Sequence, residues 1–455
     1  MKIRLTALML LAVTAMFVFS GCSLQMKTPD ELMSPPKIAG GYQNLQDSFE
    51  AVVGENVELE TPMNGEHKSA FIIDDFDSDG NEDAMVFYSE KGKKSTVNIG
   101  IFNKDKDSDK WNYIKSVKGL GNSVDTVVLD DMNGDGLKEV VVGWNLLNLS
   151  KQLSVYEPST LDSSNYFYEM GSFQYSLFDM IDIDSDSHKE LFFVNLENTN
   201  NVQSASAQAA KISKDGKKVE SVGKTALDGN VSGYSKIYTD KADGKVTVLV
   251  DAAKGEHDMI TELIVWDSAS SNLSAPLFDT QKQINSATWR NSRTYVTDID
   301  ADGHLEIPVG VKIPGSSNVV SGEVQEDELC YIRWCDFENS KLKAKRYNLY
   351  NYSEGYSLEI PSSWVGRITV SSLDSQWYFY RWNASAKEHM GEMLFSVVSH
   401  TVGAGGIEGY SNLTEYNGKS YEYIITAQGK KFGITDDSIK KGFSVITDRQ
   451  GENTK

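Results

Sequence analysis

The sequence predicts a mainly β fold, a β-propeller of about five four-stranded blades followed by a small C-terminal α+β domain. A nine-residue acidic pattern recurs along much of the chain. Short runs of β-branched and aromatic residues, separated by Gly, Asp and Asn, surround each copy and are typical of strands. The acidic pattern disappears at about Ser353, although strand-like runs continue beyond it.

The first 21 residues have the composition of an export signal. Lys2 and Arg4 form a short basic segment, and residues 5–19 are apolar apart from two threonines. An apolar stretch of roughly 7–15 residues before small residues is typical of a cleaved signal, so we expect residues 1–21 to be removed. The sequence Phe-Ser-Gly-Cys that ends at Cys22 resembles the bacterial lipobox, which implies lipid attachment to this cysteine. The alternatives are an ordinary secretory signal with a chance cysteine, and an uncleaved anchor.

Two segments connect this signal to the first repeat. Residues 22–41 contain three prolines and two glycines, and we expect them to form a tether with little structure. Residues 42–64 form a lead-in to the repeats. Within it, the apolar residues from Tyr42 to Val53 have the spacing of a short amphipathic helix, which we expect to pack against the first blade.

Composition limits the kinds of partner. The chain has 455 residues and a formal net charge of −21 at pH 7. An acidic surface argues against nucleic acid and against adsorption to anionic lipid, because both require basic patches, and it favours divalent cations. Besides Cys22, only Cys330 and Cys335 are present. On one strand they would lie on opposite faces roughly 16 Å apart, too far for a disulfide, so we expect them to be packing residues.

Four nonapeptides share one template, with acidic or amide residues at positions 1, 3 and 5, an apolar residue at position 2 and Asp or Glu at position 9. They occupy residues 75–83, 131–139, 182–190 and 298–306. The first three follow one another at intervals of roughly 50–60 residues, and the fourth comes after about twice that interval. Residues 238–246, midway in the longer gap, form a shortened copy that we expect to bind no metal.

Each copy of the template lies between strand-like runs. Ala84–Tyr88 follows the first copy and Val140–Trp144 follows the second. Two further strand candidates complete each unit, such as Val97–Phe102 and Trp111–Val117 in the first. Four short strands per unit correspond to a propeller blade, which predicts a propeller over residues 65–352 whose fourth blade contains the shortened copy.

The template has the chemistry of a hard-cation site. Carboxylates at positions 1, 3 and 5 of a tight turn direct oxygens toward a common centre, and a later carboxylate closes the shell, which suits Ca²⁺. An EF-hand loop shares the first half of this pattern but needs a Glu at position 12 and flanking helices. Position 12 is occupied by Val86, Val142, Phe193 and Val309, all in predicted strands. The EF-hand interpretation is therefore excluded.

With their closing acid at position 9 between two strands, the loops resemble the calcium loops of FG-GAP and VCBS-type repeats, as in integrin α-subunit propellers, over roughly residues 65–350. The segment from Pro29 to Lys37 also resembles VCBS-repeat lipoproteins of Gram-positive bacteria, which bring no known activity. The resemblance implies structural Ca²⁺ held by side chains and by position-7 carbonyls. The ligands it implies are Asp75, Asp77, Asp79, Asn81 (carbonyl) and Asp83; Asp131, Asn133, Asp135, Leu137 (carbonyl) and Glu139; Asp182, Asp184, Asp186, His188 (carbonyl) and Glu190; and Asp298, Asp300, Asp302, His304 (carbonyl) and Glu306.

Two considerations bear on this assignment. In the third copy Ser187 replaces the glycine at position 6 and would have to tolerate a positive φ. The alternative for all copies is a simple Asp-Gly turn in which Asp side chains cap backbone N–H groups. Repeated clusters of like charge argue against it, because carboxylates within one turn repel one another without a counter-ion. We expect the metal to be structural, since a catalytic metal needs an open position and neighbouring acid–base groups.

The C-terminal part differs from the repeats. Residues 353–448 predict a small α+β domain, with a further blade as the alternative. Thr435 or Asp436 is a candidate N-cap for a short helix there. The polar tail, residues 449–455, is expected to be disordered.

The sequence lacks the Gly-x-Ser-x-Gly, His-Glu-x-x-His and phosphate-loop motifs, so we predict no enzymatic activity. We expect a lipoprotein anchored to the extracytoplasmic face of the cell membrane, whose calcium-stabilised propeller binds an unknown extracytoplasmic protein or glycan and no nucleic acid. The alternative is a polysaccharide-active lyase or hydrolase on a propeller scaffold. A polar cleft with an acid pair outside the nonapeptides would favour that alternative.

Overall fold

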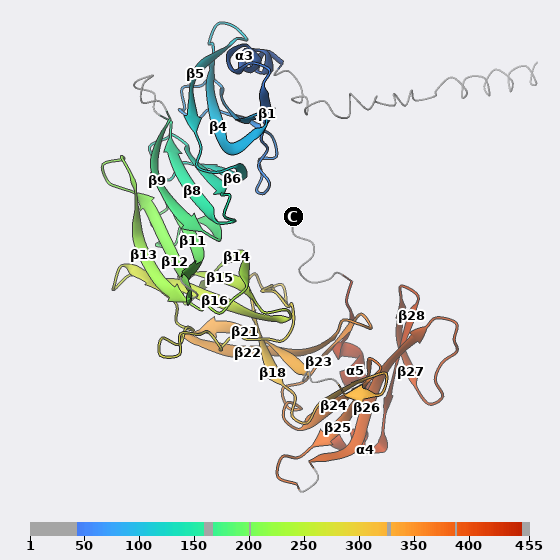
Figure 1. Cartoon of the computed structure of the whole chain (residues 1–455). Coiled ribbons are helices and arrows are strands. Elements are labelled where there is room, and N and C mark those ends of the chain that lie inside the picture. The colour runs from blue at the N-terminus through green and yellow to red at the C-terminus, as the bar shows by residue number, and fades with distance from the viewer. Residues whose placement is uncertain (1–42, 159–166, 200–201, 325–328, 387–388, 448–455) are drawn as a thin grey trace, which may run out of the picture.

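The computed structural model describes residues 43–158, 167–199, 202–324, 329–386 and 389–447. Within them the protein is mainly β, as the sequence predicts, and its strands form six sheets (Figure 1). The expected signal peptide, Cys22, the tether and the tail lie outside the described residues. None of the helices in the described ranges combines the length and apolar character that a membrane span requires.

Sheets 1 to 4 are antiparallel, and their strands pair largely in sequence order. They contain β1 (Val57–Leu59), β2 (Phe71–Asp74), β3 (Asp83–Glu90), β4 (Lys93–Lys104) and β5 (Trp111–Lys118) in sheet 1; β6 (Ser123–Asp130), β7 (Glu139–Asn145), β8 (Lys151–Glu157) and β9 (Tyr168–Tyr175) in sheet 2; β10 (Leu177–Ile181), β11 (Glu190–Thr199), β12 (Val202–Ile212) and β13 (Val219–Leu227) in sheet 3; and β14 (Gly233–Ala242), β15 (Lys245–Lys254), β16 (Asp258–Asp267) and β17 (Asn272–Ser274) in sheet 4. In sheet 1, β1 and β2 both pair with β3. Each of the four sheets therefore contains a four-stranded meander.

Sheets 5 and 6 contain the remaining strands. They are β18 (Ile307–Lys312), β21 (Cys330–Glu338), β22 (Lys341–Asn351), β23 (Tyr356–Glu359) and β29 (Phe443–Val445) in sheet 5, and β19 (Ser317–Val320), β20 (Glu323–Val324), β24 (Ile368–Leu373), β25 (Gln376–Trp382), β26 (Met390–Thr401), β27 (Ser411–Tyr416) and β28 (Lys419–Ile425) in sheet 6. β19 pairs with β24 in parallel. Cys335 is buried in β21, and in the described part of the chain no disulfide joins it to Cys330.

The boundary expected between residues 352 and 353 falls inside sheet 5. β22 turns directly into β23, with Asn351 opposite Tyr356, and β29 from the end of the chain pairs with β23. Tyr356 and Phe395 belong to one hydrophobic core that spans sheets 5 and 6. Burial of these aromatic side chains couples the C-terminal part to the last repeat, which composition alone does not indicate.

In the part of the chain that the structure describes, three short helices lie against this framework. The expected N-terminal helix is present as α3 (Gln43–Val53), whose buried Phe49 packs edge-on against Phe71 and Tyr88 of sheet 1. α4 (Ala427–Phe432) and α5 (Asp436–Gly442) lie near the C-terminus. Thr435, one of the two expected caps, forms a capping box with Ser438 at the start of α5.

The hydrophobic core is a series of clusters, most of which join neighbouring sheets, while one joins α3 to sheet 1. One joins sheets 1 and 2 around Trp144, the next joins sheets 2 and 3 around Phe193, and a third joins sheets 3 and 4 around Val250. Among the described residues no cluster joins sheet 1 to sheet 6. The sheets accordingly follow one another along an open curve, from the blue end of the ribbon to the red (Figure 1).

Candidate metal centres

The four nonapeptides lie at equivalent places in their sheets. We name them loop 1 (75–83), loop 2 (131–139), loop 3 (182–190) and loop 5 (298–306) after the sheets that they belong to. Loops 1, 2 and 3 join β2 to β3, β6 to β7 and β10 to β11. Loop 5 leads into β18, and an isolated bridge between Thr297 and Glu306 closes it. One structural unit is thus repeated at the same point of four sheets.

The loops share an unusual backbone conformation. Position 6 is left-handed in every loop, with φ of 84° at Gly80, 91° at Gly136, 77° at Ser187 and 88° at Gly303. Position 4 is also left-handed, with φ of 55° at Ser78, 76° at Gly134, 63° at Ser185 and 61° at Ala301. The expected positive φ of Ser187 is confirmed. Two left-handed residues in five positions wind the loop tightly, so that its side chains at positions 1, 3 and 5 share one side.

One hydrogen-bond scheme also recurs. The position-2 N–H donates to the closing acid, at 3.2 Å for Phe76 and Asp83, 2.8 Å for Met132 and Glu139, 3.1 Å for Ile183 and Glu190, and 2.8 Å for Ile299 and Glu306. The position-6 N–H donates to the position-1 carboxylate, and the position-7 N–H donates to the position-5 carboxylate. These bonds engage one oxygen of each acid. In loops 1, 2 and 5 a second backbone N–H donates to the other oxygen of the position-1 acid. The remaining carboxylate oxygens decide between a capped turn and a cation site.

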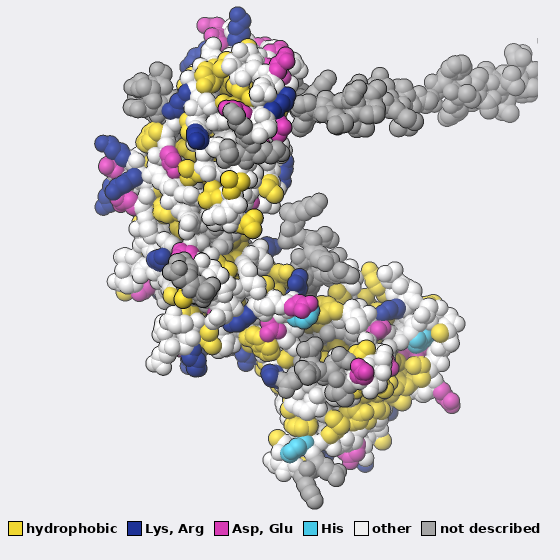
Figure 2. Space-filling model, in the orientation of Figure 1, with side chains coloured by type: hydrophobic (Ala, Val, Ile, Leu, Met, Phe, Trp, Pro, Cys, Tyr) yellow, Lys and Arg dark blue, Asp and Glu magenta, His cyan; other side chains and the backbone are white. Residues whose placement is uncertain are grey.

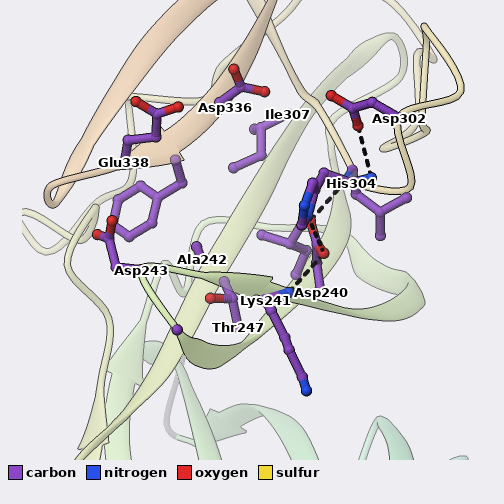
Figure 3. Close-up of a pocket in the computed structure, with 14 residues that line it drawn as sticks. Asp240, Lys241, Ala242, Asp243, Thr247, Asp302, His304, Ile307, Asp336 and Glu338 are labelled. Carbon is purple, nitrogen blue, oxygen red and sulfur yellow. Dashed lines mark hydrogen bonds and ion pairs between the residues drawn. The ribbon is translucent and has the colours of Figure 1, made fainter.

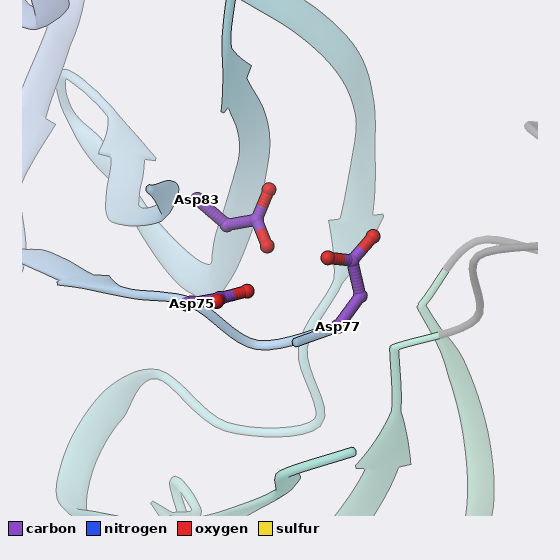
Figure 4. Close-up of side chains that lie close together, drawn as sticks. All are labelled: Asp75, Asp77 and Asp83. Carbon is purple, nitrogen blue, oxygen red and sulfur yellow. The ribbon is translucent and has the colours of Figure 1, made fainter. Parts of the chain in front are cut away.

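Loop 1 brings three carboxylates together. Asp75, Asp77 and Asp83 each offer an oxygen within 4.8 Å of the others, and Figure 4 shows the three side chains converging on one region. Burial and the negative charge of Asp79 raise the pKa of Asp77. Loop 3 makes the same grouping, of positions 1, 3 and 9, with Asp182, Asp184 and Glu190. In loop 5 the grouped acids are instead those at positions 1, 3 and 5, Asp298, Asp300 and Asp302. An all-oxygen donor set of this kind fits a hard divalent cation.

In loop 2 the support for a cation site comes from the closing acid, Glu139. Glu139 is fully buried, and its Oε1 has no hydrogen-bond partner among the described residues, whereas Oε2 accepts the N–H of Met132. Burial raises the pKa of Glu139 to about 8, and the charges of Asp135 and Asp131 add to the rise. A buried carboxylate oxygen without a partner is costly, and a cation in the loop would neutralise it.

Two lysines that the sequence did not predict enter loops 3 and 5. Lys345 of β22 donates to Asp300 at 3.0 Å, to Asp302 at 2.5 Å and to Glu306 at 2.6 Å. Although partial burial alone would lower the pKa of Lys345, its hydrogen bonds to these acids raise it. Lys211 of β12 lies in loop 3 in the same way. Both lysines come from later strands of their own sheets, so only strand pairing could have found them.

The two histidines at position 7 make contacts outside their own loops. The His304 ring lies 3.1 Å from Asp240 of sheet 4. The His188 ring lies so close to Gly134 of loop 2 that a Cβ atom there would come within 2.4 Å of it. Asn81 stays local and donates to Asp79. The backbone carbonyls of these residues are the expected ligands, and the two histidine rings contact the neighbouring sheet instead.

Ion pairs and a hydrogen bond connect each of loops 1 to 3 to the neighbouring sheet. Lys138 of loop 2 pairs with Asp74 of β2 at 2.8 Å, and Lys189 of loop 3 pairs with Asp130 of β6 at 2.5 Å. Ser78 of loop 1 donates to the carbonyl of Gly136 in loop 2. The acidic loops of sheets 1 to 3 therefore line one edge of the sheet array, each in contact with the next.

Sheet 4 has a short hairpin in place of the acidic loop and so interrupts the row of loops. Its shortened copy is a two-residue hairpin, with Ala242 opposite Lys245 and positive φ at Asp243 and Gly244, the conformation that Asp-Gly hairpins favour. A cavity of about 490 Å³ lies between this hairpin, loop 5 and β21 (Figure 3). Its lining includes five acidic residues, Asp240, Asp243, Asp302, Asp336 and Glu338. His304 and Lys241 are the basic residues of the lining.

Sheet 6 contains one histidine and two serines close together in sequence, His400, Ser396 and Ser399, and each has another partner. His400 pairs with Glu422 at 3.3 Å, Ser396 hydrogen-bonds to Tyr410, and Ser399 donates to Glu354. The side chains of this set are therefore not arranged as a nucleophile with its base.

No protein-family model matches this chain, and a comparison with curated proteins finds no match. The assignment of the loops therefore depends on the chemistry of the residues themselves.

Proposed function

We propose that this protein is a membrane-anchored extracytoplasmic lipoprotein whose acidic loops bind Ca²⁺, and that the stiffened sheet array is a binding module for a protein or glycan. The observation that carries the proposal is the recurrence of one loop, with one backbone conformation and one hydrogen-bond scheme, at the same point of four sheets. The unpartnered Oε1 of buried Glu139 adds support, because a cation bound in the loop would interact favourably with it.

The proposed role of the metal is structural. Bound Ca²⁺ would supply a positive charge that neutralises clustered carboxylates. The loop residues hold the ends of paired strands together, since the closing acids Glu139 and Glu190 begin β7 and β11. Repetition along one edge of the array is typical of a device that stiffens a scaffold, whereas catalysis requires one centre with acid–base neighbours.

The finer fold that we propose is a propeller-like arrangement in which sheets 1 to 5 are successive blades. Three properties support it: the four-stranded meanders, the packing of each sheet face on the next, and the loops between first and second strands. On the face shown in Figure 2, basic side chains are scattered among acidic ones, and hydrophobic side chains gather over sheet 6. A scattered distribution of charge fits a protein or glycan partner better than nucleic acid.

A second candidate, a polysaccharide-active enzyme, is favoured by one observation. The cavity beside sheet 4 contains Asp336 and Glu338, two carboxylates outside the nonapeptides, on the same strand. Glycoside hydrolysis uses a pair of carboxylates in such a cleft. Lys343 neutralises Glu338 at 2.9 Å, and Lys345 lies 3.7 Å from Asp336. Because both acids already have counter-ions, we rank this candidate second.

The calcium part of the proposal is tested by thermal melting with Ca²⁺ and with EGTA. A ligand that binds only the folded state at one hundred times its dissociation constant adds about 2.7 kcal/mol of stability, so EGTA should lower Tm by several degrees. Glu139→Gln should reduce this calcium-dependent difference. Glu169→Gln, an exposed acid on β9 of the same sheet, is the matched control and should leave it unchanged.

The binding part is tested on glycan and peptide arrays, with and without EGTA. Capture that requires Ca²⁺ and leaves the captured molecule intact would support the binding module. Release of shortened glycan would favour the enzyme, and in that case Asp336→Asn should abolish turnover while leaving the calcium-dependent Tm unchanged.

A further inference from the structure

The four loops differ in the side chain that faces the closing acid from the next strand. In sheet 1 the closing Asp83 pairs with Asn103. In sheet 2 Val140 pairs with Tyr156, which places Glu157 opposite Glu139. In sheet 3 Leu191 pairs with Ala210, which places Lys211 opposite Glu190. The facing residue is thus an amide, an acid and a base in three successive sheets.

In loop 5 an ammonium group occupies the place where a metal would bind. The Lys345 Nζ contacts the acids at positions 3, 5 and 9, at 2.9 Å from Asp300, 2.5 Å from Asp302 and 2.6 Å from Glu306. These positions supply side-chain ligands in the proposed calcium loop. Only 22% of the Lys345 side chain is exposed. A bulge between Trp334 and Cys335 shifts the register with β22, the strand that carries this lysine.

Loop 3 repeats the arrangement with a lysine from a different strand. The Lys211 Nζ lies 3.0 Å from Asp184, 3.2 Å from Asp186 and 3.8 Å from Glu190, again positions 3, 5 and 9. Glu190 Oε1 is nevertheless without a hydrogen bond in the described structure, since 3.8 Å is too long for one. Lys211 therefore neutralises loop 3 less completely than Lys345 neutralises loop 5.

Loops 1 and 2 are different. In loop 2 the facing residue is Glu157, which adds negative charge, and the buried Oε1 of Glu139 has no hydrogen-bond partner among the described residues. In loop 1 the facing residue is neutral. Lys106 pairs with Asp79 of the same loop from solvent, with 65% of its side chain exposed. Exposed pairs of this kind contribute little.

We infer that the loops form two classes: loops 1 and 2 take a divalent cation, whereas Lys211 and Lys345 act as built-in counter-ions that replace it in loops 3 and 5. This inference rests on the proposed function. A metal ion and an ammonium group cannot share one set of carboxylates, because their like charges repel at this distance. Calcium can enter loops 3 and 5 only if the lysine leaves, which breaks up to three ion pairs at Lys211 and up to four at Lys345. Affinity should therefore differ between the classes.

The test is calcium stoichiometry, measured by isothermal titration calorimetry and by equilibrium dialysis with atomic absorption. The wild-type chain should bind about two ions, Lys345→Met about three, and the double variant Lys211→Met/Lys345→Met about four. Lys343→Met is the matched control, because Lys343 lies on the same strand and pairs with Glu338 outside the loops. It should leave the stoichiometry at the wild-type value.

A reciprocal variant tests the inference independently of whether the lysine variants fold. Glu157→Lys places a lysine opposite Glu139, as in sheet 3, and should lower the stoichiometry to about one ion per chain. Glu157→Gln is its control and should keep the wild-type value. Melting in EGTA shows that each variant is folded.

The outcomes separate this inference from the proposed function. Binding of four ions by the wild-type chain would overturn the division into two classes, but it would still support calcium binding by the loops. Two ions in the wild type and in both lysine variants would also overturn it, because the lysines would then not be what excludes the metal. No calcium in any variant would refute the proposed function and this inference together.

Discussion

Arg290 and Asp251 form an ion pair of 2.9 Å in which both side chains are fully buried. Asp251 lies on β15 of sheet 4 and also accepts the N–H of Val296, just before loop 5. The Arg290 guanidinium donates in addition to the carbonyl of Thr294. This pair therefore fastens sheet 4 to the segment that leads into loop 5.

Removing one partner of this pair should be strongly destabilising. Arg290→Met leaves the Asp251 carboxylate buried without its counter-charge, which typically costs about 3–5 kcal/mol. Arg293→Met is the control, because Arg293 is exposed and its guanidinium contacts only the carbonyl of Glu256 in the described structure, so a change within about 0.5 kcal/mol is expected. Urea unfolding of both variants gives the free energies. Equal stability of the two variants would show that the pair does not hold these segments together.

The closing acid of loop 2 should make metal-free stability depend on pH. The pKa of Glu139 in the folded chain is about 8, above its ordinary value of 4.5, because burial disfavours the charged form. The folded state then binds more protons than the unfolded state between these two values. In the metal-free chain, the stabilisation from this group is therefore fully present below about pH 4.5 and is lost as pH rises through about 8. The loss in the free energy of unfolding is a few kcal/mol at most.

Melting curves in EGTA from pH 5 to pH 9 measure this dependence. Glu190 contributes with the same sign, since burial and the charge of Asp184 raise its pKa to about 7. The comparison must therefore be between wild type and Glu139→Gln, whose Tm should exceed the wild-type value increasingly as pH rises. Calcium should remove the difference in slope. A constant offset between the two chains would show that Glu139 does not titrate in this range.

Ser187 occupies a left-handed position that is glycine in the three other loops. Replacing it with glycine should stabilise loop 3 by about 0.5–1 kcal/mol, because the steric cost of the side chain exceeds the entropy that glycine loses. The reciprocal change, Gly136→Ser in loop 2, should cost about 1 kcal/mol. Nothing lies within 4 Å of a Cβ atom built at Gly136, so its cost arises from the backbone alone. Chemical unfolding measures both, and two changes of the same sign would contradict the shared conformation.

The sequence predicted the loops well because their geometry is local. Acid spacing and the glycine at position 6 determine the turn, and Ser187 adopts the φ that the template requires. The left-handed conformation at position 4 was not foreseen. Ser78 and Ala301 carry no glycine signal there, and hydrogen bonds within the loop impose the conformation.

The tertiary features were harder to predict because they depend on long-range pairing. Lys211 and Lys345 reach loops 3 and 5 from strands more than twenty residues away, and for Lys345 a bulge in β21–β22 pairing shifts the register. The domain boundary expected after residue 352 did not account for the pairing of β29 with β23. Neither composition nor periodicity carries information on which strand returns to which sheet.

The lipid anchor can be tested through Cys22. Cys22→Ser removes the thiol to which lipid would be attached, so incorporation of radiolabelled palmitate should fall to background and the chain should leave the detergent phase. Cys330→Ser is the matched control, since Cys330 is a half-buried residue of β21 far along the chain. It should retain both the label and the partitioning.

The result distinguishes the three alternatives for the N-terminus. An ordinary secretory signal predicts a wild-type chain that is exported, cleaved and unlabelled, because the cysteine then has no role. An uncleaved anchor predicts a chain of full mass in the membrane fraction for wild type and Cys22→Ser alike. Lipid attachment alone predicts that one substitution removes both the label and the membrane association. One acyl chain gives only marginal anchoring, so stable attachment to the membrane needs a second lipid signal. If Cys22→Ser releases the chain completely, the whole anchor lies at this residue.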